Sequence, residues 1–163
     1  MHDEKKQFLT PTINLFFNAN DFVKFVLNLN YYLGLTPIPC STPEKYPVLA
    51  LDDILLYCVH YNTSEEAIRK WEERKQRINF DKVFVLMNDR NGFDEHTYSE
   101  FKKITFPKLL LTNSNDYVED SLLIHNSKHK YTEDLSRFTF FGKRKIFKTK
   151  AKLIIKEKME KAL

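Results

Sequence analysis

The chain has 163 residues, of which 42% are hydrophobic and 29% charged, with a net charge of +4 and only three Gly and six Pro. This length fits one domain with a buried core, and the composition is that of a globular rather than a disordered or fibrous protein. The three glycines stand far apart, which excludes Gly-rich phosphate loops and the Gly-x-Ser-x-Gly nucleophile elbow.

The N-terminal part predicts a strand followed by a helix. Residues 12–17, "TINLFF", are rich in β-branched and aromatic side chains, as strands are. Residues 20–34 carry apolar side chains at helical spacing, and we expect Asn20 to cap this helix and Gly34 to end it. Residues 37–47 hold four of the six prolines, which predicts a loop.

The middle of the chain predicts a hairpin and then a helix. Two apolar runs within residues 48–61 flank a pair of aspartates, as in a hairpin or a bent strand. Thr63 and Glu66 have the spacing of a capping box, because each side chain can satisfy a backbone donor of the other. A helix should therefore follow, ending near Ile78.

Strands and helices continue to alternate further along. The pattern predicts a strand at 82–88, a short helix at 94–103, and strands at 108–113 and 121–125. Such alternation is typical of an α/β fold with three layers, a mostly parallel sheet with helices on both faces. We expect a single α/β domain over residues 1–141.

Polar residues follow the strand at 82–88. In α/β folds the loops at the carboxyl ends of strands collect functional groups, which makes Asn88, Asp89 and Arg90 candidates. Asp89 suits a base or charge anchor, and Arg90 suits a clamp on a phosphate or carboxylate. The alternative is a plain turn, with Gly92 at positive φ before Asp94 caps the next helix.

Three other residues are candidates. His60 ends an apolar run and suits proton transfer near neutral pH, with a structural role as the alternative. Arg74 falls on the apolar stripe of its helix, so it needs a carboxylate, a phosphate or water; Asp89 is its predicted partner, and ligand binding is the alternative. Asn113 would lie beside residues 88–91 if their two strands are neighbours.

The basic charge is concentrated at the C-terminus. Residues 142–163 hold nine Lys or Arg and two Glu, a net +7, which leaves −3 for the rest of the +4 chain. This predicts a basic C-terminal helical tail, solvated or in peripheral contact with an anionic membrane surface. Nucleic-acid binding is disfavoured, because no interleaved aromatic platform accompanies the lysines.

The sequence favours a cytoplasmic protein. The charged N-terminus has no apolar run behind it long enough for a signal peptide, and no segment approaches the roughly 18 apolar residues of a membrane span. Cys40 and Cys58 stand alone, as reduced and buried thiols do. Zinc-binding and HExxH spacings are absent, so no metal site is predicted.

Residues 46–92 resemble the domain of unknown function numbered 1919, a family of bacterial exopolysaccharide biosynthesis. The matching motifs are Tyr46-Pro47, His60-Tyr61, Glu66-Ala67, residues 70–75, Arg77-Ile78-Asn79, and Asp89-Arg90 before Gly92. The resemblance extends upstream through residues 20–33 and more loosely to about residue 125. It implies a three-layer α/β fold and a setting in capsule, exopolysaccharide or lipopolysaccharide synthesis, without an established reaction.

Two features depart from the family pattern. Family members begin with an additional strand and turn that "MHDEKKQFL" does not match, so the chain resembles an N-terminally shortened member. An acid tends to stand where this chain has Asn91, which argues against a metal site with two carboxylates.

We therefore expect a transferase of surface-polysaccharide assembly that uses an activated sugar or acyl donor. A homo-oligomer and a location peripheral to the inner face of the membrane are compatible with this expectation. No cofactor is assigned. The alternative is a non-catalytic binding or scaffold protein of the same pathway. The expected catalytic residues are Asp89, Arg90 and His60, and the expected substrate-binding residues are Asn88, Arg74 and Asn113.

Overall fold

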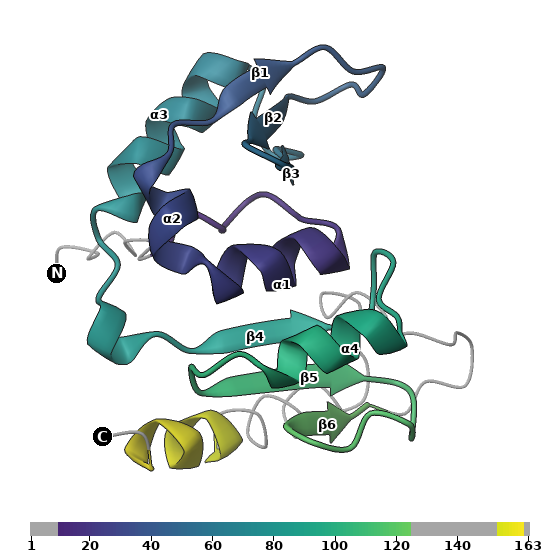
Figure 1. Cartoon of the computed structure of the whole chain (residues 1–163). Coiled ribbons are helices and arrows are strands. Elements are labelled where there is room, and N and C mark those ends of the chain that lie inside the picture. Colours follow the sequence, from purple (N-terminus) through teal and green to yellow (C-terminus); the bar gives the residue numbers. More distant parts are fainter. Residues whose placement is uncertain (1–9, 125–152, 162–163) are drawn as a thin grey trace, which may run out of the picture. The chain divides into compact units, whose positions relative to one another are not determined.

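The computed structural model describes residues 10–124 and 153–161 (Figure 1). These residues fall into two compact units, the first ending at Phe80 and the second beginning at Asp81. The expected mixed α/β composition is confirmed. The single domain predicted over residues 1–141 stays a prediction, because a division into compact units does not say whether each unit folds alone.

The first unit begins with two helices where the sequence predicts one. α1 spans Ala19–Leu27 and α2 spans Leu29–Gly34. The first helix starts after Asn18 rather than after the predicted cap Asn20, and the break falls at Asn28, whose φ of −121° leaves the helical region. Gly34 ends α2, as predicted.

Three short strands form an antiparallel sheet in this unit: β1 (Ile38–Cys40), β2 (Val48–Leu51) and β3 (Ile54–Tyr57), in the order β1-β2-β3. Only two residues join β2 to β3, and Asp52 takes a φ of 58° in that turn. A two-residue connection forces antiparallel pairing, because it is too short to carry the chain back to the start of the preceding strand. One mostly parallel sheet for the whole chain is therefore not confirmed.

The strand predicted at residues 12–17 is wrong. Residues 11–14 form a turn, and Phe16 makes an isolated antiparallel bridge with Tyr57, on whose ring it stacks at 4.5 Å. The proline-rich stretch predicted as a loop contains β1. Pro39 sits in that strand at the edge of the sheet, where a missing N–H is tolerated.

α3 spans Ser64–Lys75 and completes the first unit. Its predicted N-terminus is confirmed, because the Thr63 hydroxyl accepts a hydrogen bond from the Glu66 N–H at 3.2 Å. The helix ends at Lys75, one turn before the expected Ile78. Its buried Trp71 meets the ring of Phe25 from α1 at 5.9 Å, so the two helices share one core.

The second unit contains a parallel sheet. After a short 3-10 turn, η1 (Phe80–Lys82), come β4 (Val85–Asn88), α4 (Glu95–Lys102), β5 (Lys108–Thr112) and β6 (Ser121–Leu123). The strand order is β4-β5-β6, with both pairs parallel. α4 is the crossover that allows β4 and β5 to run in the same direction.

Helices cover both faces of this parallel sheet. Within the described part of the predicted tail, residues 153–160 are helical, and Ile154 and Ile155 pack against Leu109 and Leu111 of β5. Lys108 points to the opposite face, where its amine donates to two carbonyls at the end of α4, each at 2.7 Å. Residues 142–152 of the tail lie outside the described residues.

Candidate functional site

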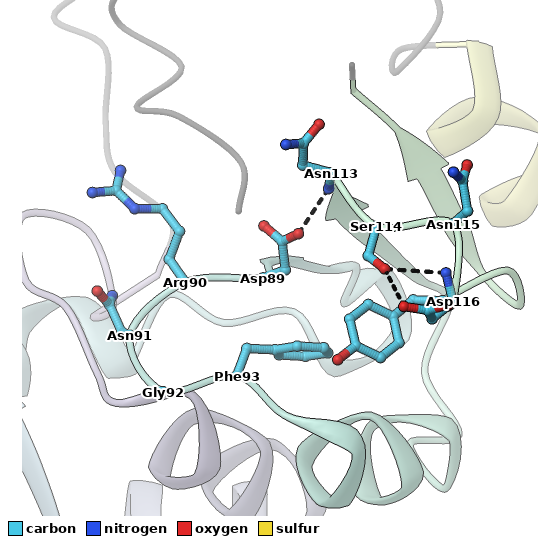
Figure 2. Close-up of a pocket in the computed structure, with 10 residues that line it drawn as sticks. Asp89, Arg90, Asn91, Gly92, Phe93, Asn113, Ser114, Asn115 and Asp116 are labelled. Atoms are coloured by element: carbon cyan, nitrogen blue, oxygen red, sulfur yellow. Dashed lines mark hydrogen bonds between the residues drawn. The ribbon is translucent and has the colours of Figure 1, made fainter. Parts of the chain in front are cut away.

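A pocket of about 770 Å³ lies at the carboxyl ends of β4 and β5 (Figure 2). Two loops form it, one after each strand, at the edge where parallel sheets usually carry their functional groups. The lining residues are Asp89, Arg90, Asn91, Gly92 and Phe93 from the first loop and Asn113, Ser114, Asn115, Asp116 and Tyr117 from the second.

Asp89 joins the two loops. Its side chain is buried, and Oδ2 accepts hydrogen bonds from the Thr112 hydroxyl at 2.9 Å and from the Asn113 backbone N–H at 2.7 Å. Its own N–H donates to the Leu111 carbonyl at 3.1 Å. Figure 2 shows the carboxylate turned toward Asn113, so Asp89 anchors the end of β4 to the end of β5.

The loop after β4 makes a tight turn. The Phe93 N–H donates to the Arg90 carbonyl at 3.3 Å, and the two residues between them, Asn91 and Gly92, have φ of 55° and 83°. Positive φ at both central positions is what an Asn-Gly turn accommodates best. The predicted positive φ of Gly92 is confirmed, and the turn carries Arg90 to the side of the pocket opposite Asp116 (Figure 2).

The turn leads directly into α4. The Asp94 carboxylate accepts hydrogen bonds from the Thr97 backbone N–H and from the Thr97 hydroxyl, both at 2.7 Å. These two bonds, the backbone one first, hold the pKa of Asp94 below its usual range. The predicted cap at Asp94 is therefore confirmed.

Hydrogen bonds within the loop after β5 fix its polar groups. The Ser114 N–H donates to the Thr112 hydroxyl at 3.0 Å, and the Ser114 hydroxyl donates to the Asp116 carboxylate at 2.7 Å. The Asp116 N–H returns a bond to the Ser114 hydroxyl at 3.1 Å. Asp116 thus presents a carboxylate whose orientation is set by its own loop.

Two aromatic rings form one wall of the pocket. Phe93 and Tyr117 meet edge to face, with ring centroids 5.1 Å apart. Burial raises the pKa of Tyr117, and the charges of Glu95, Asp116 and two further aspartates raise it again. The Tyr117 hydroxyl therefore stays protonated near neutral pH and can donate a hydrogen bond.

The structure brings together three of the six predicted site residues. Asp89, Arg90 and Asn113 line the pocket, while Asn88 is the half-buried last residue of β4 and is not among the lining residues. His60 is exposed and belongs to the first unit. Its proposed catalytic role stays a prediction.

Arg74 also belongs to the first unit, where it is only 6% exposed. Its guanidinium donates to the Tyr61 hydroxyl at 2.7 Å and to the Ile13 carbonyl at 3.1 Å. These bonds account for a charged group on the apolar face of α3. The predicted pairing with Asp89 would join residues of the two units and stays a prediction.

Sequence reasoning missed the aromatic wall and the acid beside it. Phe93, Tyr117 and Asp116 stand outside every motif of the sequence, and only the pairing of β4 with β5 brings their loops together. The available signal was their position, since each follows a polar stretch just after a buried strand.

The pocket offers three kinds of contact to a ligand. Planar amide and carboxylate groups pair with hydroxyls, the Arg90 guanidinium binds anionic oxygens, and the rings of Phe93 and Tyr117 pack on C–H groups. Within residues 10–124 and 153–161, no group of three His, Cys, Asp or Glu side chains is arranged to hold a metal ion. No helix in the described part of the chain is long and apolar enough to cross a membrane.

The chain matches a known family over most of its length. The model of a domain of unknown function, DUF1919, matches residues 1–154, a longer stretch than the resemblance expected from residue 20 to about residue 125. An uncharacterized protein of Haemophilus influenzae is 30% identical over 117 residues, which cover 72% of this chain and 57% of that protein. The matched region thus spans less than two thirds of this relative.

Proposed function

This chain belongs to the DUF1919 family, and we propose that it is a transferase of bacterial surface-polysaccharide assembly whose pocket binds an activated sugar. The proposal places the protein in the cytoplasm, at the inner face of the membrane. The single observation that carries it is the chemical make-up of the pocket at the ends of β4 and β5.

A sugar bound through a phosphate needs the three contacts that this pocket combines. Its hydroxyls pair with amides and carboxylates, here three asparagines and two aspartates, and its C–H face packs on aromatic rings. Its phosphate needs a cation, which Arg90 supplies. An acyl chain would need aliphatic walls, and none of the ten lining residues is aliphatic, so the pocket favours a sugar donor over an acyl donor.

The proposed roles follow from the geometry. Arg90 binds the phosphate on one side, and Asn113 with Asp116 binds sugar hydroxyls on the other (Figure 2). Asp89 acts as the charge anchor rather than as the base, because its carboxylate already accepts two hydrogen bonds from the end of β5. Asp116, exposed and oriented by Ser114, is the better base for an acceptor hydroxyl.

A non-catalytic sugar-binding protein of the same pathway is the second candidate. The engagement of Asp89 favours it, because the most buried carboxylate of the pocket is used for structure. Both candidates share the ligand and differ in whether the bond to the phosphate is broken.

Ligand binding is tested first, by the melting temperature of the full chain with uridine diphosphate glucose, uridine diphosphate N-acetylglucosamine, guanosine diphosphate mannose or palmitoyl-coenzyme A. We expect a rise with at least one nucleotide sugar and none with palmitoyl-coenzyme A. Arg90→Gln should abolish the rise. Arg69→Gln is the matched control and should retain it, because Arg69 is 63% exposed on α3 of the first unit. A flat response to every nucleotide sugar would refute the proposal.

Catalysis is tested next, by the release of nucleoside diphosphate from the sugar that binds, in the presence of membranes from a polysaccharide-producing bacterium. Release above that of Asp116→Asn would support the transferase. Binding without any release would leave the non-catalytic candidate.

A further inference from the structure

We propose that Tyr98 is the positioning residue of this pocket: it holds the loop after β5 in the shape that binds the sugar. This inference rests on the proposed function. Tyr98 lies on α4, outside the ten residues that line the pocket.

The hydroxyl of Tyr98 makes two hydrogen bonds with the backbone of one loop residue. It accepts from the Glu119 N–H at 2.8 Å and donates to the Glu119 carbonyl at 3.2 Å. A side chain that satisfies both backbone groups of a residue fixes that residue's position and orientation. Glu119 stands two residues after Tyr117, the aromatic residue of the pocket wall.

The ring of Tyr98 supports the same wall. Its centroid lies 4.8 Å from that of Tyr117 and 6.5 Å from that of Phe93, so one ring outside the pocket contacts both rings inside it. The Lys102 amine lies 5.2 Å from the centroid of the Tyr98 ring. Tyr98 is thus held by its own helix while it contacts the loop.

Other anchors of this loop lie after Glu119, where the Asp120 carbonyl accepts from the Leu110 N–H at 2.8 Å and the Asp120 carboxylate pairs with Lys108 at 3.6 Å. The Ser121 hydroxyl donates to the Tyr117 and Val118 carbonyls at 2.6 and 3.0 Å. The Asp116 carboxylate accepts a hydrogen bond from Ser114, a residue of the same loop. The side chain of Val118 is 77% exposed and contributes little packing. Without the Tyr98 hydroxyl, we expect this part of the loop to sample more conformations, and the ligand must then order it on binding.

Tyr98→Phe tests the inference, because it keeps the ring and removes both hydrogen bonds. We expect the dissociation constant of the nucleotide sugar that raises the melting temperature most to increase about five- to tenfold, as for the loss of about one net hydrogen bond. Hydrogen exchange at the Glu119 amide should become faster in the same variant, with or without ligand.

Tyr31→Phe is the matched control. The Tyr31 hydroxyl donates to the Asp52 carboxylate at 2.7 Å in the first unit. Tyr31→Phe therefore also removes a tyrosine hydroxyl, but at a residue that belongs to neither loop of the pocket. Its dissociation constant should equal that of the wild type.

The outcomes separate this inference from the proposed function. If the wild type binds a nucleotide sugar and Tyr98→Phe binds it equally well, Tyr98 does not position the pocket, while the proposed function stands. The same holds if affinity falls but Glu119 exchange is unchanged, because the effect then does not pass through the loop. If the wild type binds none of the probes, the proposed function fails, and this inference fails with it.

Discussion

At the scale of single residues, the carboxylate of Asp89 holds the ends of β4 and β5 together. Asp89→Ala removes the acceptor of the Thr112 hydroxyl and of the Asn113 N–H. We expect the free energy of unfolding to fall by about 1–3 kcal/mol, as for buried donors that lose their partner. Urea unfolding followed by circular dichroism measures this. Asp89→Asn keeps an acceptor oxygen and should lose less; equal stability of Asp89→Ala and wild type would contradict the anchoring role.

Gly92 gives a second prediction at this scale. Its φ of 83° is unfavourable for any residue with a Cβ, and apart from its chain neighbours no atom of the described residues lies within 4 Å of where that Cβ would be. Gly92→Ala should therefore destabilise the fold by about 1 kcal/mol through the backbone alone. Gly34→Ala is the matched control, since Gly34 is equally uncrowded but lacks a positive φ. It should be neutral or slightly stabilising, and equal losses at the two glycines would show that φ is not the cause.

Three of the ten residues that line the pocket were predicted as site residues from the sequence. Asp89, Arg90 and Asn113 were found because each lies at or just after the end of a strand that the sequence predicts, and strand ends define the functional edge of a parallel sheet. Phe93 and Tyr117 could not be found in this way. Their place in the pocket depends on which strands pair and on how each loop turns. The spacing of residues in the sequence predicts neither.

At the scale of elements, the N-cap of α4 makes stability depend on pH. The pKa of Asp94 is lowered by the hydrogen bonds from Thr97, so the folded state favours the carboxylate. The stabilisation is therefore fully present above the ordinary pKa of Asp, about 3.9, and is lost as the pH falls through the lowered pKa. Asp94→Ala should be less stable than wild type at pH 7, and the difference should shrink below about pH 4.

Thr63 is the control for this prediction, because it caps α3 with a hydroxyl that does not titrate. Thr63→Ala should lower the unfolding free energy by about 1 kcal/mol at pH 7. Urea titrations at several pH values measure both variants. An Asp94→Ala difference that varies with pH no more than that of Thr63→Ala would contradict the account.

The helix at 153–160 provides another prediction at this scale. Ile154 packs against the cluster of Leu109 and Leu111, whereas Leu153 is 56% exposed. Ile154→Ala should lower the unfolding free energy by about 1 kcal/mol, and Leu153→Ala should change it by less than about 0.5 kcal/mol. The reverse order, measured by urea unfolding, would mean that this helix does not use its apolar side to cover the sheet.

Apolar periodicity and capping residues predicted most helices and strands of the chain. The predictions failed where the structure depends on which strands pair. The hairpin, the capped start of α3 and the alternation of β4, α4 and β5 follow from periodicity and capping residues. Residues 12–17 have the composition of a strand but form only a bridge at Phe16. A strand forms only where a neighbouring strand pairs with it over several residues. Nothing in the apolar periodicity of residues 20–34 marks the break at Asn28.

At the scale of the whole molecule, the sequence indicates an α/β fold but not its division into an antiparallel and a parallel sheet. Connection length separates the two: the two-residue turn between β2 and β3 allows only antiparallel pairing, and α4 allows β4 and β5 to be parallel. The candidate site follows from this division. The pocket lies in the unit with parallel strands, where loops from neighbouring strands meet at one edge.

We propose above all that the pocket at the ends of β4 and β5 binds a nucleotide sugar. The most direct test is to follow the backbone amide resonances of the full chain while adding the nucleotide sugar that raises its melting temperature most. We predict that the largest shifts fall within residues 89–93 and 113–117. Shifts confined to residues before Asp81, with both loops unchanged, would contradict the claim.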